Sequence, residues 1–235
     1  DELVKYKQDP RSEMADRILD DLFAAIDKYG KNDLSKEAKK VLENWDRNMN
    51  VDSKGAALFY FWASKMGYWR SKMYKTPWDP KKPRTTPDGL ADPESAVKVL
   101  NAVASYIKKK FGKLDVAWGK IYRLKGGKYN LPANGASGGL GVFRVAWEGG
   151  SGKNGETYVG GGDSWVGVIE FGKKVKAKVL LSYGNSTQKG SKHNGDQLVL
   201  FSKKQLRDAW YYNKDIQKNK ARIEVLKKGK FVEEK

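Results

Sequence analysis

Apolar residues in the first half of the chain recur every three or four positions, the period of an amphipathic helix. One stripe begins after Ser12, a suitable N-cap, stops at Gly30, and consists of Met14, Ile18, Leu19, Leu22, Phe23 and Ile26. A second helix is predicted from about Ser35, with Ala38, Val41, Leu42 and Trp45 on one face. Residues 56–69 are apolar on nearly every side, which is typical of a buried helix. These patterns predict core-forming helices.

A polar segment rich in proline follows at residues 75–93 and contains Pro77, Pro80, Pro83, Pro87 and Pro93. Proline removes a backbone donor, so we expect an extended surface excursion here and no regular element. Asp92 as N-cap and Pro93 at the first helical position then open another helix. Its apolar face is Val97, Leu100, Val103, Ala104 and Ile107, and Gly112 ends it.

From Leu124 onward the pattern changes to short β-type runs separated by glycine. The runs lie at residues 142–147, 157–159, 165–171, 175–183 and 198–201. A helix is expected within 203–219, which contains an aromatic cluster at 210–212, and a last strand at 222–226. The chain therefore predicts an α+β fold: a mainly helical segment at 1–123 with its excursion at 75–93, then a β-rich segment of antiparallel strands at 124–235.

The runs at 165–171 and 175–183 mix alternation with continuous apolar stretches, which favours strands partly covered on both faces. The predicted helices could cover one face. An open apolar edge promotes aggregation, so we expect another polypeptide to complete the remaining face and at least one sheet edge.

Composition narrows the class of protein. The chain has 235 residues, of which 39% are hydrophobic, enough to bury a core. It has no run of about 18 apolar residues, so no membrane-spanning helix is expected. It contains no cysteine, which excludes disulfides and thiol catalysis.

The formal net charge of +18 raises the alternative of a nucleic-acid-binding protein. The basic residues are mostly lysines spread from Lys5 to Lys235, and arginine, the residue suited to bidentate recognition of phosphate and guanine, is scarce. We therefore expect no nucleic acid, and a basic surface that faces solvent, an acidic partner chain or an anionic envelope.

Two glycine-rich segments, at 135–141 and 160–162, superficially resemble phosphate-binding loops. Such a loop precedes a helix, whereas strands are predicted after both clusters. Tight turns or close approach of two strands is the better interpretation.

Three residues have the types of a hydrolytic triad: Ser186, His193 and Asp196. They crowd a short polar loop, and nothing in the sequence places the serine on a nucleophile elbow or supplies an oxyanion hole, so we expect no catalysis from them. Residues 46–52 resemble the start of a calcium loop but lack its glycine and its bidentate glutamate, so a turn held by Asn and Asp side chains is expected. With one His and no Cys, a zinc site is not expected either.

Several short motifs occur in a consistent order in the second half. They are Gly161-Gly162-Asp163-Ser164, Tyr183-Gly184-Asn185-Ser186, His193-Asn194-Gly195-Asp196-Gln197 and Leu200-Phe201. Together they resemble the C-terminal region of the penicillin acylase family of N-terminal-nucleophile amidohydrolases, in particular the acyl-homoserine-lactone and aculeacin acylases. Upstream segments extend the resemblance to roughly residues 22–210.

The resemblance implies a four-layer αββα core completed by another chain, a smaller alpha chain, autoproteolytic processing, and a periplasmic or secreted location. The family's nucleophile is the first residue of its catalytic chain, a Ser, Thr or Cys whose free α-amine is the general base. This chain begins with Asp1, and the family's oxyanion-hole asparagine lies upstream of the matching segment.

We therefore expect a C-terminal structural part of an enzyme that hydrolyses an acyl amide, with quorum quenching left open. No catalytic, cofactor-binding or metal-binding residue is expected in this segment. The alternative is a non-catalytic acylase-like scaffold or binding protein with a basic surface.

Overall fold

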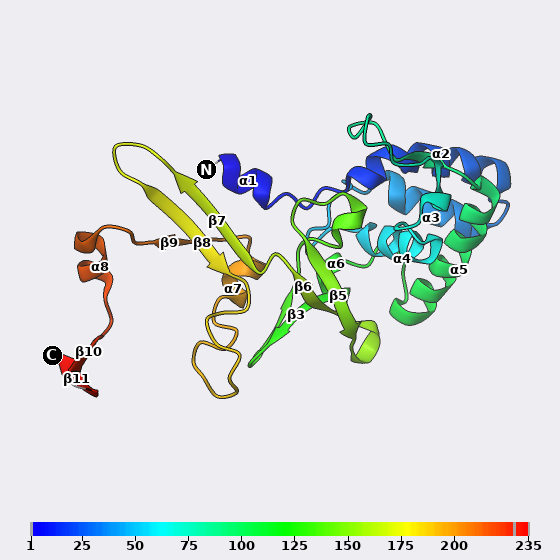
Figure 1. The fold of residues 1–235 in the computed structure, drawn as a ribbon. Helices are drawn as coiled ribbons and strands as arrows, with labels where there is room; N and C mark the ends of the chain where they lie inside the picture. Colours follow the sequence, from blue (N-terminus) through cyan, green and yellow to red (C-terminus); the bar gives the residue numbers. More distant parts are fainter. Residues whose placement is uncertain (1, 228, 235) are drawn as a thin grey trace.

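Four helices pack together into one lobe at the right of the ribbon in Figure 1. The structure is a computed structural model that describes residues 2–227 and 229–234. The helices of the lobe are α2 (Glu13–Tyr29), α3 (Asp33–Glu43), α4 (Ala56–Met66) and α5 (Pro93–Phe111), whereas α1 (Glu2–Lys7) lies apart from them. The buried face of α5 contains the whole predicted stripe, and that of α2 contains it except for Phe23, which is only partly buried against the core.

Local capping explains where these helices begin and end. Ser12 accepts a hydrogen bond from the Ala15 amide, and Asp92 accepts one from the Ser95 amide, as predicted. Helix α3 begins two residues before the predicted start because Asn32 caps it. The predicted helix at 56–69 ends three residues early at Met66, because Gly67 adopts a left-handed conformation at φ 74°.

The proline-rich excursion is not wholly irregular, which corrects the sequence-based expectation. A 3₁₀ turn, η1 (Ser71–Met73), leads into β1 (Tyr74–Thr76), which pairs antiparallel with β2 (Asp88–Leu90). The two short strands flank the prolines that precede Pro93. The Leu90 amide donates to the Asp21 carboxylate at 2.9 Å, which ties this small ribbon to α2.

A four-stranded sheet lies beside the helical lobe, in the order β4-β3-β6-β5. It consists of β3 (Tyr122–Gly126), β4 (Tyr129–Pro132), β5 (Ala146–Ser151) and β6 (Thr157–Gly162), with α6 (Trp118–Ile121), η2 (Gly138–Leu140) and η3 (Lys153–Gly155) between or before the strands. The predicted antiparallel pairing holds for β3 with β4 and for β5 with β6, whereas β3 and β6 pair parallel, so this sheet is mixed. The buried core runs from the helices into this sheet. Here the rings of Trp118 and Tyr122 stack, with their centroids 4.4 Å apart.

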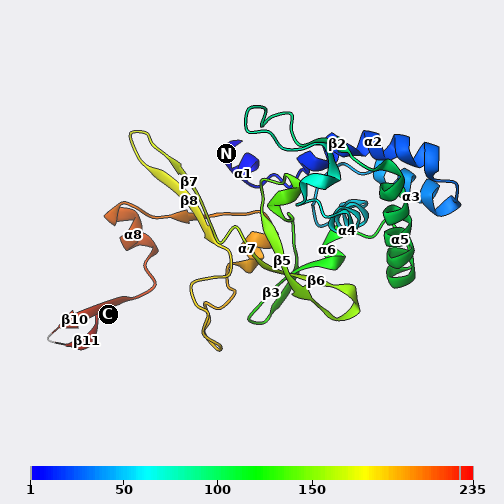
Figure 2. The same cartoon turned by 45° about the vertical axis from the view of Figure 1, so that its right-hand side comes forward.

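A second sheet, antiparallel and three-stranded, has the order β7-β8-β9. Its strands are β7 (Trp165–Glu170), β8 (Lys176–Leu181) and β9 (Arg207–Ala209). Figures 1 and 2 show the β7–β8 hairpin projecting away from the rest of the molecule. The chain continues through α8 (Asn213–Asn219) to a terminal ribbon of β10 (Ile223–Lys227) and β11 (Lys230–Glu234).

Two predicted elements in this half differ from the structure in extent or in type. The run at 142–147 becomes a strand only from Ala146, because the Arg144 amide donates to the Asp9 carbonyl and not to a sheet partner. The run at 198–201 is helix α7 (Leu198–Ser202), which buries Leu198 and Phe201. The helix expected within 203–219 is confirmed as α8, which begins only at Asn213 and is preceded by strand β9.

Candidate functional site

The residues that suggested the family resemblance lie at the junction between the two larger sheets. The Asp163 carboxylate accepts a hydrogen bond from Lys7 Nζ at 2.6 Å and one from the Val145 amide at 3.2 Å. The Asp163 carbonyl accepts a hydrogen bond from the Ser182 hydroxyl, and the Ser182 amide donates to the Ser164 carbonyl at 2.9 Å. Asp163 therefore joins the end of β6 to β8 and to the N-terminal segment.

The second group of motif residues fixes the polar loop after β8. Gln197 is buried, and its Oε1 accepts from the Leu181 amide at 3.0 Å while its Nε2 donates to Asn185 Oδ1 at 3.2 Å. The Gly195 amide donates to the Tyr183 carbonyl at 2.9 Å. Gly184 has φ 85°, and a Cβ there would collide with the His193 carbonyl and the Asp196 carboxylate. These residues hold the loop against the sheet.

Gly184→Ala is expected to destabilise the protein by about 3 kcal/mol, because it adds a steric clash to the cost of about 1–2 kcal/mol of a left-handed alanine. Gly190 is a matched control, since its φ is 88° and a Cβ there would meet no atom within 4 Å. Gly190→Ala should lower the free energy of unfolding only by the cost of a left-handed alanine, about 1–2 kcal/mol. Urea denaturation of the two variants measures the difference, and equal losses would contradict a packing role for Gly184.

The structure does not assemble Ser186, His193 and Asp196 into a triad. His193 Nδ1 lies 3.0 Å from Asp196 Oδ2, but the Ser186 hydroxyl accepts from the Gln188 amide at 3.1 Å, and its own amide donates to the His193 carbonyl. Within the part of the chain that the structure describes, no hydrogen bond joins the Ser186 hydroxyl to the His193 ring. The arrangement suits a surface loop and offers no activated nucleophile.

His193→Ala is accordingly expected to leave the amide-hydrolysing activity of an assembled enzyme within about twofold of wild type, because an exposed ion pair contributes little. The side chains of His193 and Asp196 are 50% and 33% exposed. Turnover of an acyl amide, measured together with yield of the assembled protein, tests this. Loss of turnover in a fully assembled variant would show that His193 takes part in the chemistry.

The segment that resembles a calcium loop and the glycine cluster at 160–162 form a turn and a close strand contact. The segment 46–52 forms the expected Asx turn, in which the Asn48 amide donates to Asp46 Oδ1 at 3.0 Å. At the second glycine cluster, Gly149 of β5 and Gly160 of β6 approach so closely that a Cβ on either would strike the other backbone. Close strand approach is confirmed there. No group of three or more potential metal ligands occurs among the residues that the structure describes.

A buried guanidinium, which sequence reasoning missed, holds this junction together. Arg144 is fully buried and donates hydrogen bonds to the Gln8 side chain and to the carbonyls of Phe201 and Asn134. Its guanidinium also lies 4.1 Å from the centre of the Phe201 ring. Asn134 in turn donates to the Ser202 carbonyl at 2.6 Å. The only signal in the sequence was an arginine placed among apolar neighbours at 142–145.

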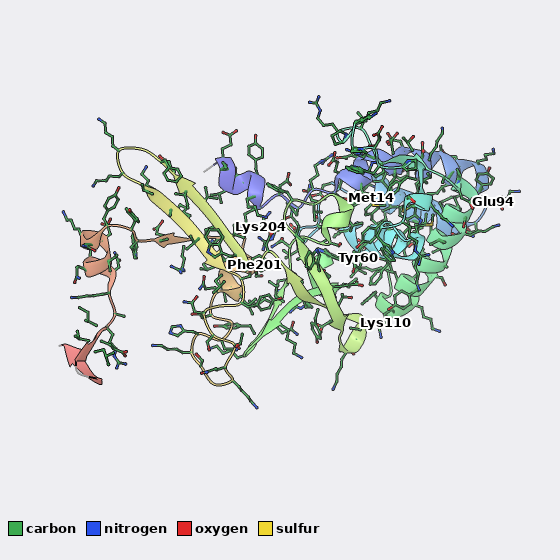
Figure 3. All side chains as sticks on the ribbon, in the orientation of Figure 1. Met14, Tyr60, Glu94, Lys110, Phe201 and Lys204 are labelled. Carbon is green, nitrogen blue, oxygen red and sulfur yellow. The ribbon has the colours of Figure 1, made fainter. Side chains whose placement is uncertain are left out.

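The electrostatics of this cluster are unfavourable to a cation. Burial lowers the pKa of Arg144 from 12.5 to about 10, only partly offset by the charge of Asp163. Burial and then the Arg144 charge lower the pKa of the neighbouring Lys204, whose Nζ donates to Asn50 Oδ1 at 2.8 Å. Figure 3 labels Phe201 and Lys204 at the base of the hairpin. Arg144 is held by carbonyl acceptors and by the Phe201 ring, which take the role that a directly bonded carboxylate would otherwise have.

One face of the β7–β8 hairpin is entirely apolar. Because residues opposite each other in an antiparallel pair share a face, the register places six residues together: Trp165, Gly167, Ile169, Ala177, Val179 and Leu181. We call this set the apolar hairpin face. Trp165 and Ile169 are 58% and 48% exposed, and Phe171, just beyond β7, is 83% exposed. Strand β7 also has a neighbour on one side only among the described strands.

The chain as a whole exposes more surface than a compact protein of its size. Its accessible surface is 14774 Å². A compact monomer of this length would expose about 10,700 Å². The surplus of about 4,000 Å² exceeds the roughly 1,000–2,500 Å² that one partner contributes to a typical obligate protein interface. Among the residues described, none of the helices is long and apolar enough to cross a bilayer. Exposed apolar faces of this kind are typical of binding surfaces.

Comparison with known proteins gives the chain its family. The family model for penicillin amidase matches residues 1–218. An acyl-homoserine lactone acylase, PvdQ of Pseudomonas fluorescens Pf0-1, is 31% identical over 171 residues, which cover 70% of this chain and 22% of that protein. PvdQ of Pseudomonas syringae pv. tomato is 29% identical over 204 residues, which cover 81% of this chain and 26% of that protein. The chain thus spans about a quarter of the length of these relatives. With its matching motifs placed at the junction of the two sheets, the chain belongs to the penicillin amidase family.

Proposed function

We propose that this chain is the C-terminal structural part of an acylase that hydrolyses an acyl amide through an N-terminal nucleophile on a separate chain. The surplus accessible surface, together with the exposed Trp165 and Ile169 of the apolar hairpin face, is the observation that carries the proposal. Membership of the penicillin amidase family supports the reaction class. The names of the relatives support an acyl amide, with acyl-homoserine lactones as one candidate.

The division of labour follows from what the chain contains. The nucleophile of the assembled enzyme would be a Ser, Thr or Cys whose own α-amine accepts its proton, and attack on the amide carbonyl would give an acyl-enzyme that water then hydrolyses. The described residues of this chain would supply no group to that step. They would position the catalytic chain by completing its sheets, with a smaller alpha chain as a further component, in a four-layer αββα core.

The rigid junction suits this role. Asp163, Arg144 and Gln197 bond the β7–β8 hairpin, α7 and the N-terminal segment into one unit. A partner that binds the hairpin is therefore connected to the four-stranded sheet and, through the shared core, to the helical lobe. The family resemblance alone supports a periplasmic or secreted location.

Identification of the polypeptides that co-purify with this chain tests the proposal. We expect N-terminal sequencing to find a companion that begins with Ser, Thr or Cys, and an acylating inhibitor to label that residue. A complete assembly without such a terminus would overturn the proposal and favour the alternative, a non-catalytic scaffold with a basic surface. A soluble, cooperatively folded monomer of this segment alone would contradict the assembly role.

A further inference from the structure

The net positive charge of the chain is concentrated in its second half. Residues 124–235 hold 21 of the 46 lysines and arginines but 10 of the 28 aspartates and glutamates. Between Glu170 and Asp196 the sequence contains six lysines and no acidic residue. Like charges gathered in this way repel one another and destabilise a compact state unless a ligand neutralises them.

Three of these basic side chains surround one concavity. The turn between β3 and β4 and the polar loop at 186–194 line a hollow of about 660 Å³. We call it the basic hollow; it is lined by Lys128, Lys189 and Lys192, with Tyr129, Thr187 and Ser191. Figures 1 and 2 both place the end of β3 next to this loop, below α7. Its volume is within the range of small-ligand sites.

The walls of the basic hollow are fixed to each other. Gly127, with φ 55°, packs so close to Asn194 that a Cβ there would lie 2.7 Å from the Asn194 carbonyl oxygen. Asn194 Nδ2 donates to the Ser186 carbonyl at 3.1 Å, and the Asn194 amide donates to the Ser191 carbonyl at 3.1 Å. These bonds span the loop from end to end. The hollow is therefore preorganised, which lowers the entropic cost of binding a ligand.

The charges at the hollow are not neutralised by the protein. Lys128, Lys189 and Lys192 are exposed, and within residues 2–227 and 229–234 none of them forms an ion pair with a carboxylate. None of the lining residues is acidic. The nearest carboxylate in the loop, that of Asp196, is engaged with His193. Lys128 Nζ lies 5.5 Å from the centre of the Tyr129 ring, so the aromatic residue supports the cation.

We propose that the basic hollow binds inorganic polyphosphate, a soluble and multivalent phosphate chain. Lysine ammonium groups bind phosphate as point charges, and the Thr187 and Ser191 hydroxyls add donors. A narrow flexible chain can enter a hollow, whereas a flat bilayer touches only protruding groups. A protein partner would need an apolar anchor, and the one aromatic residue of the hollow, Tyr129, is half-buried under Lys128. The site goes beyond the acylase role and does not depend on it.

Calorimetric titration of the protein, purified with any polypeptide that accompanies it, tests the site with tripolyphosphate and longer polyphosphate at low salt. The triple variant Lys128→Gln/Lys189→Gln/Lys192→Gln should bind at least tenfold more weakly than wild type. The matched control is Lys72→Gln/Lys81→Gln/Lys82→Gln, which removes the same charge from exposed lysines of η1 and the proline-rich excursion. The control should change affinity by less than twofold.

Equal losses of polyphosphate affinity in the two triple variants would overturn the proposal, because they would show that the ligand is attracted by the net charge of the protein alone. Absence of binding in wild type would also overturn it. Tighter binding to phosphatidylglycerol vesicles than to polyphosphate would also overturn the proposal, because it would identify a membrane surface as the ligand. All variants change exposed side chains, so unaltered circular dichroism and assembly are expected. Amide hydrolysis should be the same in every variant, which separates this test from that of the proposed function.

Discussion

The double variant Trp165→Glu/Phe171→Glu is expected to lose its association with the nucleophile-bearing polypeptide, with affinity at least hundredfold weaker, or about 3 kcal/mol. Trp165 is 58% exposed and Phe171 83% exposed at the β7–β8 hairpin. A carboxylate in a desolvated interface has no partner and is strongly unfavourable. Co-purification from a co-expressing strain, followed by size-exclusion chromatography, measures the loss.

Two other exposed aromatic residues provide the control. Trp69 and Trp78 are 63% and 60% exposed but belong to the helical lobe and the proline-rich excursion. Trp69→Glu/Trp78→Glu should retain the partner. If both double variants lost the partner equally, general loss of solubility would explain the result, and if both retained it, the apolar hairpin face would not be the interface.

The second large effect is expected at the buried guanidinium. Arg144→Ala should lower the free energy of unfolding of the assembled protein by about 3–5 kcal/mol, because it leaves buried carbonyls without donors and opens a cavity. The carbonyls of Phe201 and Asn134 and the Gln8 side chain would lose their donor together. Arg144→Lys should recover only part of the loss, since one ammonium cannot reproduce the fork of a guanidinium. Denaturant unfolding measures each variant.

Arg70 is the matched control for this position. It is exposed, and no side-chain hydrogen bond or ion pair of Arg70 occurs among the described residues. Arg70→Ala should therefore change stability by about 0.5 kcal/mol or less. A similar small change for Arg144→Ala would mean that Arg144 is not what joins the N-terminal segment, α7 and the two sheets.

The sequence determined the elements whose causes are local. Ser12 and Asp92 cap helices with their own side chains, and Gly112 ends α5 with φ 80°, so residues within one turn of each other decide where α2 and α5 lie. The hairpin of β7 and β8 follows from two adjacent apolar runs. The motifs from Gly161 to Phe201 were likewise sufficient to predict the family, because their order and spacing are properties of the chain itself.

Tertiary structure alone decided the features that depend on distant partners. Four apolar residues at 198–201 fit a strand or a helix equally well, and burial of Leu198 and Phe201 on one side made them α7. Arg144 is bonded to Gln8, 136 positions away in the sequence, and no local pattern encodes that contact. Ser186, His193 and Asp196 are neighbours in sequence, yet loop hydrogen bonds turn the serine hydroxyl to the Gln188 amide. Spacing along the chain fixes local hydrogen bonds, whereas contacts between distant segments form only when the whole chain has packed.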